Sequence, residues 1–138
     1  MEPADELPYG DERSRTYKAA SGGKRCDHLL FIPEHGELDR FLPFADIRLM
    51  EIRKDGAELL IEFSATVVIL TGKSLRPLAY AVGARTRSRL EAFDARHHDK
   101  PTNATDPYIA SIRYYTRTGK KEQVQEQEPE TKAMAAAQ

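Results

Sequence analysis

The sequence predicts a small α+β domain in which a short antiparallel sheet packs on one amphipathic helix. An Asp-Gly corner at residues 55–56 separates two segments rich in β-forming residues, which indicates a hairpin. Apolar residues then recur every three or four positions over residues 75–94, which indicates a helix. The length of 138 residues and the 40% apolar content suffice for one core, so we expect a single domain at residues 28–117.

The expected element order is β-β-β-α-β, and its first three strands form a meander. Asp55 and Gly56 can adopt the positive φ angles of a two-residue type I′ turn, so residues 47–53 should pair antiparallel with residues 58–64. A bulge near Leu49 would reconcile the two apolar faces of the first strand. Residues 67–70 are apolar without alternation, which is typical of a strand covered on both faces.

A helix is expected over residues 75–94, with Ser74 as its N-cap and Pro77 in its first turn. Residues 108–117 alternate and form the last strand of the order. In front of the hairpin we expect a short extra strand at residues 28–32 and a helical turn at residues 37–42. The helix should face the sheet with a stripe of Leu75, Leu78, Val82, Thr86, Leu90 and Phe93.

The two ends are expected to be tails. Residues 1–27 combine dense charge with few large apolar groups, which predicts a disordered polar tail, and residues 118–138 form a charged, Gln- and Ala-rich tail. The single cysteine, Cys26, excludes an internal disulfide and fits a reducing compartment. No segment resembles an export signal or a membrane span, so we expect a soluble, cytoplasmic chain without a membrane partner.

Charge is segregated along the chain although the formal net charge is −1. Residues 28–70 hold eight acidic and four basic residues, whereas residues 71–117 hold nine basic and four acidic ones. Such asymmetry favours either an anionic partner for the basic half or self-association in which the two halves meet.

Several familiar sites are incomplete. Residues 71–74, Thr-Gly-Lys-Ser, resemble the end of a phosphate-binding loop, but Val67 stands where that motif requires glycine. His97 and His98 are adjacent, a spacing that does not chelate zinc, and we interpret them as helix-end residues that interact with the helix dipole. We therefore expect no catalytic residue, no metal site and no cofactor.

The leading hypothesis is a non-enzymatic binding or assembly module that self-associates. An alternative is a nucleic-acid-binding accessory protein, in which arginines contact phosphates and tyrosines stack on bases. A second alternative is a small anion-binding or enzymatic domain around Lys73, Ser74 and His97. The candidate anion or nucleic-acid contacts are Lys73, Arg76, Arg85, Arg89, Arg113, Tyr115 and Arg117, with Arg87, Arg96 and Tyr114 on the same expected surface.

Overall fold

The computed structural model describes residues 15–23, 26–101, 103 and 105–117. These residues form eight strands, one α-helix and two short 3-10 segments. In chain order they are β1 (Ala20–Ser21), β2 (His28–Ile32), β3 (Arg40–Pro43), η2 (Phe44–Asp46), β4 (Ile47–Arg53), η3 (Lys54–Gly56), β5 (Glu58–Phe63), β6 (Thr66–Lys73), α1 (Arg76–Gly83), β7 (Arg89–Glu91) and β8 (Tyr108–Thr116). The chain is thus of mixed α+β class with strands predominating.

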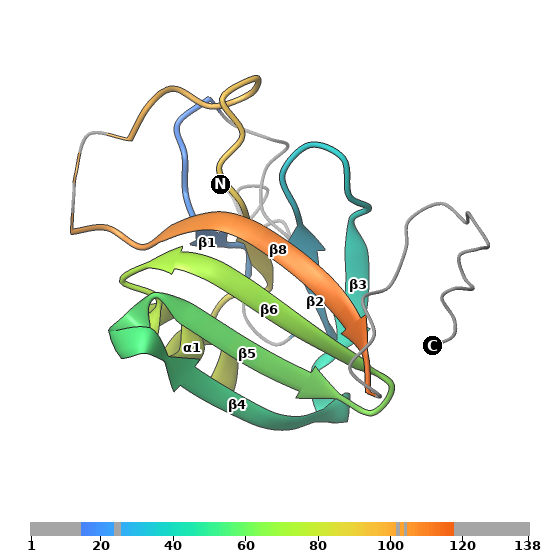
Figure 1. Cartoon of the computed structure of the whole chain (residues 1–138). Coiled ribbons are helices and arrows are strands. Elements are labelled where there is room, and N and C mark those ends of the chain that lie inside the picture. Colours follow the sequence, from blue (N-terminus) through green and yellow to red (C-terminus); the bar gives the residue numbers. More distant parts are fainter. Residues whose placement is uncertain (1–14, 24–25, 102, 104, 118–138) are drawn as a thin grey trace, which may run out of the picture.

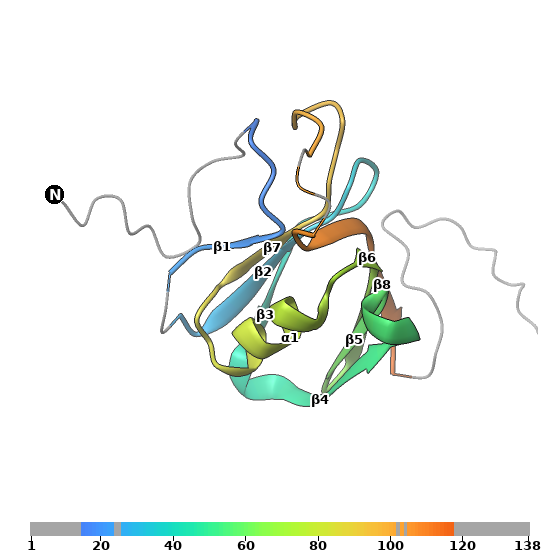
Figure 2. The ribbon, with the colours of Figure 1, turned by 90° about the vertical axis from the view of Figure 1, so that its left-hand side faces the viewer.

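The strands form two sheets, so the single sheet expected from the sequence is wrong. One sheet has the order β1-β7-β2-β3 and the other has the order β4-β5-β6-β8. All neighbours are antiparallel except β2 and β7, which run parallel. Seen from the side, the two sheets face each other and α1 lies between them at one end (Figure 2).

The predicted hairpin is present as β4 and β5. Asp55 and Gly56 both have positive φ, 55° and 92°, and the N–H of Ala57 donates to the carbonyl of Lys54 at 3.1 Å. The last strand pair joins Arg53 to Glu58, so four residues rather than two make the connection. The predicted bulge is confirmed, because the register shifts between Ile47 and Leu49.

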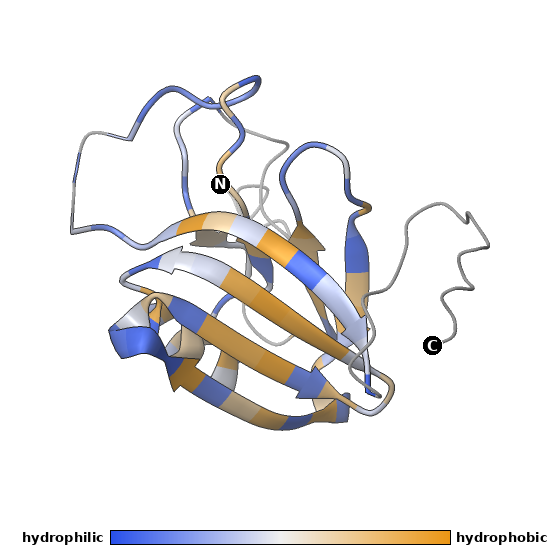
Figure 3. Ribbon diagram, viewed as in Figure 1, coloured by the Kyte–Doolittle hydropathy of each residue, from blue (hydrophilic) through white to orange (hydrophobic). Residues whose placement is uncertain are grey.

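Strand β6 alternates in burial, so the prediction that it is covered on both faces is wrong. Val68 and Leu70 are fully buried, whereas Val67 and Ile69 are half-buried on the opposite face. Hydrophobic residues run without a break along the middle of β6, at residues 67–70 (Figure 3). A continuous apolar run therefore belongs here to a strand with one buried face and one partly covered face.

The predicted helix over residues 75–94 is wrong in its second half, because α1 ends at Gly83. The N–H of Thr86 donates to the carbonyl of Ala81 at 3.0 Å and that of Arg85 to Val82 at 3.0 Å, the bond pattern of a Schellman motif. Arg85 has a φ of 55°, the left-handed conformation that this motif requires. The chain therefore turns away and re-enters as β7.

The start of α1 also differs from the prediction. Pro77 lies in its first turn as expected, but Leu75 occupies the N-cap position without a side-chain cap bond. Ser74, the predicted cap, lies between the end of β6 and the N-cap residue and has a φ of 57°. The helical turn expected at residues 37–42 is also wrong, because β3 occupies Arg40–Pro43.

The predicted boundary at residue 27 places the start of the folded part too late. Ala19 is buried, and Ala20–Ser21 form β1 beside β7. The N–H of Glu91 donates to the carbonyl of Ala19 at 2.9 Å. The rest of the predicted N-terminal tail, residues 1–14 and 24–25, and the C-terminal tail, residues 118–138, lie outside the described residues.

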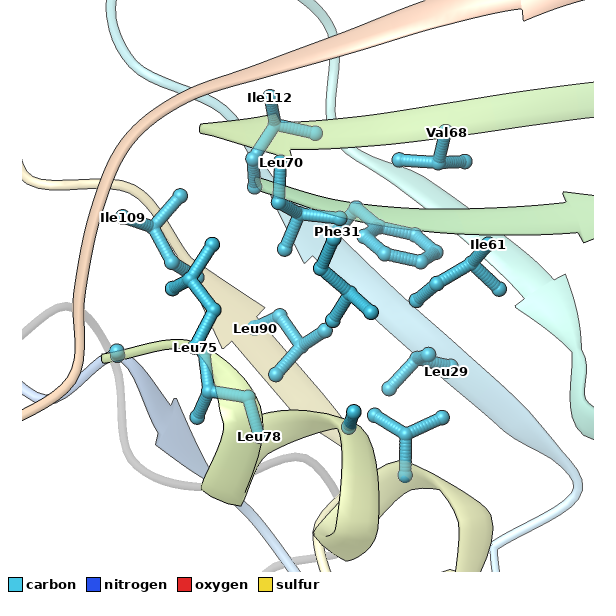
Figure 4. Packing of buried hydrophobic residues seen from close by; sticks show 14 of the residues in the cluster. Leu29, Phe31, Ile61, Val68, Leu70, Leu75, Leu78, Leu90, Ile109 and Ile112 are labelled. Atoms are coloured by element: carbon cyan, nitrogen blue, oxygen red, sulfur yellow. The ribbon is translucent and has the colours of Figure 1, made fainter. Parts of the chain in front are cut away.

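The core lies between the sheets and the buried face of α1 (Figure 4). Leu75, Leu78 and Val82 of the predicted stripe are at most 3% exposed. Leu90 is also fully buried, but from β7 rather than from the helix. The other fully buried large side chains include Leu29, Phe31, Leu59, Ile61, Phe63, Ile109 and Ile112. No helix in the part of the chain that the structure describes is long and apolar enough to cross a membrane.

Candidate ligand-binding cleft

Most of the arginines expected along the helix of residues 75–94 lie outside α1. Arg76 opens α1 and Arg85 follows it, both exposed, whereas Arg89 lies in β7 and is 6% exposed. The four- and seven-residue spacing of Arg85, Arg89 and Arg96 predicts one shared helix face, and this prediction is wrong because α1 ends at Gly83. Arg87 lies in the exposed connection between α1 and β7.

Arg113 of β8 and Arg117, which follows β8, are both paired with carboxylates. Arg113 forms an ion pair with Glu34, which also accepts from the N–H of Ile112 at 3.1 Å. The Nε of Arg117 lies 2.8 Å from Oε2 of Glu62 on β5. The first pair connects β8 to the turn after β2, and the second connects the end of β8 to β5.

The two adjacent tyrosines near the end of β8, Tyr114 and Tyr115, point to opposite sides. Tyr114 is 2% exposed and its hydroxyl donates to the carbonyl of Leu38 at 2.8 Å, so its predicted place on the basic surface is wrong. Tyr115 is half-buried beside Val67 on the outer face of the sheet. The structure therefore does not gather the predicted contacts into one groove.

A different region brings polar and aromatic groups together. Residues 15–19, before β1, and the connection between β7 and β8 lie side by side above the sheets (Figure 1; Figure 2). The N–H of Asp99 donates to the carbonyl of Arg15 at 2.7 Å, and the two side chains form an ion pair at 2.9 Å. The hydroxyl of Tyr17 donates to the carbonyl of Glu91 at 2.7 Å and accepts from the N–H of Ile109 at 2.9 Å.

Tyr17 is fixed as a neutral phenol. Burial raises the pKa of the Tyr17 hydroxyl well above its usual range, and the hydrogen bond from the N–H of Ile109 opposes this rise without cancelling it. Its donor and its acceptor capacity are both used by backbone groups. The side chain therefore acts as a strut between the N-terminal segment, β7 and β8.

A buried network of charged groups lies beside Tyr17. Glu91 accepts from the Nη2 of Arg89 through Oε1 at 3.0 Å and contacts the Nε2 of His98 through Oε2 at 2.8 Å. The Nδ1 of His98 lies 3.0 Å from the N–H nitrogen of Asp94 and 3.1 Å from its carbonyl oxygen. The ring therefore finds partners on both nitrogens whether neutral or charged. Neither His97 nor His98 lies at the end of a helix, because α1 ends at Gly83. The prediction that these two residues interact with a helix dipole is therefore wrong.

Four rings pack around this network. Tyr17 meets Phe93 and His98 edge-to-face, with centroids 5.6 Å and 5.1 Å apart. Phe93 stacks on His98 at 5.6 Å and is tilted by 35° against Tyr108 at 5.7 Å. Such offset and edge-to-face contacts are the favoured arrangements of aromatic pairs. Together these rings form one aromatic wall, defined as Tyr17, Phe93, His98 and Tyr108.

The aromatic wall lines a cleft of about 1220 Å³. Its lining carries three exposed lysines, Lys18, Lys73 and Lys100. Lys73 also lies over the Tyr108 ring, 5.7 Å from the centroid. Within the described ranges, none of these ammonium groups has a carboxylate within 4.0 Å. The remaining lining comes from residues 16, 19–20, 78, 95, 99, 101, 103 and 106–107.

In the described part of the chain, no three His, Cys, Asp or Glu side chains lie close enough together to hold a metal ion. Cys26 is half-buried, and its Sγ lies 4.0 Å from the carbonyl of Gly23.

Comparisons with protein-family profiles, with curated proteins and with solved structures found no significant match.

Sequence reasoning identified one residue of this cleft, Lys73, and missed the rest. Ser74 and His97, its predicted companions, do not line the cleft. Tyr17 was assigned to a disordered tail and Phe93 to a helix. The available signal was weak: each is a lone large aromatic residue in a polar segment, which is typical of a residue that anchors that segment.

Proposed function

We propose that this chain is a non-enzymatic binding module and that the cleft beside the aromatic wall is its binding site. The observation that carries the proposal is the combination, in one concave region, of ring surfaces and lysines that have no carboxylate partner among the described residues. Ligand sites are typically concave, largely apolar and furnished with a few polar groups. Here the lining supplies that combination from four separate segments, namely the N-terminal segment, the end of β6, α1 and the β7–β8 connection.

The buried groups beside the cleft support binding rather than catalysis. A general acid or base needs an atom within hydrogen-bond reach of the substrate. Both nitrogens of His98, both oxygens of the Glu91 carboxylate and the hydroxyl of Tyr17 already contact protein groups. Their roles in the fold are therefore those of struts that hold the cleft in shape.

The alternatives from the sequence receive unequal support. The nucleic-acid surface built on Arg85, Arg89 and Arg113 receives less support, because Arg89 is buried and both Arg89 and Arg113 are ion-paired. The anion-binding alternative keeps Lys73, which lines the cleft. Anion binding therefore remains the version of the proposal that the lysines favour.

The test is a thermal-shift screen of the full chain against anionic, cationic, neutral aromatic and aliphatic small molecules. A cleft ligand stabilises the folded state by about 2.7 kcal/mol at a concentration of ~100 Kd. The matched variants are Ala95→Trp, which places a ring in the cleft lining, and Ala45→Trp at an exposed position on η2. We expect hits that Ala95→Trp abolishes and Ala45→Trp retains. A screen without such hits would remove the proposal.

Self-association is a second candidate, favoured by one surface. The outer face of the β4-β5-β6-β8 sheet carries Leu49, Leu60, Val67, Ile69 and Tyr115 among the charged residues Glu51, Glu62 and Arg113. Leu49 is 42% exposed, whereas Leu60 is 8% exposed. Apolar residues that remain at a protein surface are common in protein contacts. Light scattering after size exclusion should show a dimer that Leu49→Lys converts to a monomer. A strict monomer of the unsubstituted chain at micromolar concentration would exclude this candidate.

A further inference from the structure

Resting on the proposed binding function, we propose that the ligand of the cleft is a planar aromatic ring that carries an anionic group, as a nucleoside monophosphate does. The aromatic wall would receive the ring and the lysines would receive the anion. The shared chemistry of base and phosphate has two sources, a free mononucleotide or a nucleotide within a single strand.

The ring part of the ligand follows from how the wall is built. Tyr17, Phe93 and Tyr108 are half-buried, so each leaves part of its ring at the cleft. Their other contacts are made with one another, at centroid distances of 5.6 Å, 5.7 Å and 5.9 Å. A planar ring stacked on such a wall keeps the offset geometry that aromatic pairs favour and tolerates different ring types.

The anionic part follows from the charge balance of the lining. Lys18, Lys73 and Lys100 are exposed and have no carboxylate partner within the described ranges. The carboxylates of the lining are Asp99, which is engaged by Arg15, and Asp106. Positive charge therefore exceeds negative charge around the cleft. Lysine is a strongly hydrated point charge that suits phosphate and carboxylate alike.

A cationic ligand is disfavoured by the same features. Recognition of quaternary ammonium groups uses aromatic faces that surround the cation. In this wall the Nζ of Lys73 already lies over the Tyr108 ring, 5.7 Å from its centroid, so a cationic ligand at that ring would meet a like charge. The lysines of the lining would also repel a cation.

Size allows either source of the ligand. The cleft volume of about 1220 Å³ exceeds the ~300–1000 Å³ that encloses typical small ligands. The cleft can therefore hold one mononucleotide with room for a neighbouring unit. A strand would pass its phosphates along the lysines, and a free nucleotide would use them at one point.

The experiment is isothermal titration of the full chain at low salt with AMP, adenosine, inorganic phosphate, choline and a short oligoadenylate. We expect AMP to bind at least about tenfold more tightly than adenosine or phosphate alone, because it uses both parts of the cleft. The double variant Lys73→Ala/Lys100→Ala should weaken AMP binding by about tenfold or more, and higher salt should weaken it further. The double variant Arg48→Ala/Arg87→Ala removes the same number of charges at exposed positions outside the cleft lining and should leave AMP affinity within about twofold.

Three results would overturn the inference: equal affinities for AMP and adenosine, tighter binding of choline than of AMP, or unchanged AMP affinity in the double lysine variant. The oligoadenylate identifies the source, since a gain of about tenfold over AMP indicates a strand and equal affinity indicates a free nucleotide. If the thermal-shift screen finds a cleft ligand of another class while AMP fails, this inference is wrong and the binding function stands. If no compound binds the cleft, both are wrong.

Discussion

The hydroxyl of Tyr17 accepts a hydrogen bond from the backbone N–H of Ile109, 2.9 Å away and 92 residues later in the chain. The same hydroxyl donates to the carbonyl of Glu91 at 2.7 Å. One side chain thus joins the N-terminal segment to a strand of each sheet. Ile109 is fully buried, so water does not reach its N–H, and without the Tyr17 hydroxyl this N–H would have no hydrogen-bond acceptor.

Substitution of Tyr17 by Phe should destabilise the fold. It leaves the N–H of Ile109 buried without its acceptor, which costs about 1–3 kcal/mol. Chemical denaturation measures the change in the free energy of unfolding. Tyr80→Phe is the matched control, because Tyr80 is 67% exposed and should change stability by less than about 0.5 kcal/mol. Equal effects of the two variants would contradict the role of Tyr17 as a strut.

Two Arg–Glu pairs of the same spacing permit a comparison of burial. Arg89 and Glu91 on β7 lie 3.0 Å apart with side chains 7% and 6% exposed. Arg53 and Glu51 on β4 lie 2.8 Å apart with side chains 45% and 43% exposed. Glu91→Ala should cost about 3–5 kcal/mol, because it removes a partner of a buried charge. Glu51→Ala should cost less than about 1 kcal/mol. Similar losses in denaturation experiments would show that burial does not set the strength of these pairs.

Two glycines should respond oppositely to alanine. A Cβ on Gly72 would lie 1.8 Å from the carbonyl oxygen of Tyr108, and the obstacle is backbone of β8. Gly72→Ala should therefore cost at least about 3 kcal/mol and separate β6 from β8. A Cβ on Gly83 would meet the flexible end of Met50 at 3.4 Å, so Gly83→Ala should be neutral or stabilising by up to about 1 kcal/mol. Thermal unfolding distinguishes them, and a tolerated Gly72→Ala would contradict the described register.

Asp46 should make stability depend on acid. The hydroxyl and the N–H of Ser64 both donate to its carboxylate, and these bonds lower the pKa of Asp46 below the ordinary 3.8. The folded state therefore binds this proton less tightly than the unfolded state, and the stabilisation is complete above pH 3.8 and lost as pH falls through the folded pKa. Asp46→Asn should cost stability at neutral pH, and the cost should shrink in acid. Urea unfolding of both proteins across this range gives the difference, and a constant difference would refute the linkage.

The hairpin was predictable because its signal is local. Asp55 and Gly56 specify positive φ angles by their own chemistry, whatever surrounds them. The bulge near Leu49 was predictable for a similar reason, since the apolar residues of one short strand change face there. Both features depend on neighbouring residues rather than on distant partners.

Of the first sheet only β2 was predictable, because the short apolar run at residues 28–32 matches that strand. Strands β1 and β7 span two and three residues, too few for a pattern to appear. Leu90 and Phe93 continue the three- or four-residue spacing of the helix although they lie outside it. The end of the helix carries no sequence signal, because Arg85 occupies the left-handed position where glycine is usual. Arg89 and Glu91 then form part of a buried strand, where charged residues are unexpected unless paired.

The cleft was missed because it is assembled from segments far apart in sequence. Tyr17, Phe93 and Tyr108 contact one another in the folded structure although they come from the N-terminal segment, the β7–β8 connection and β8. Each contact depends on tertiary structure, which the periodicity of hydrophobic residues along the sequence does not reveal. Lys73 was identified for its place between a strand and a helix, and the structure gives it an aromatic neighbour instead of a phosphate-binding loop.

The most direct test of the binding site is an amide-resolved NMR titration of the labelled full chain with AMP. We predict that the largest shifts occur at Ala19, Ala95 and Tyr108, which line the cleft. Shifts concentrated on the outer face of the sheet, at Leu60, Ile69 and Tyr115, or no shifts at any concentration, would contradict the account.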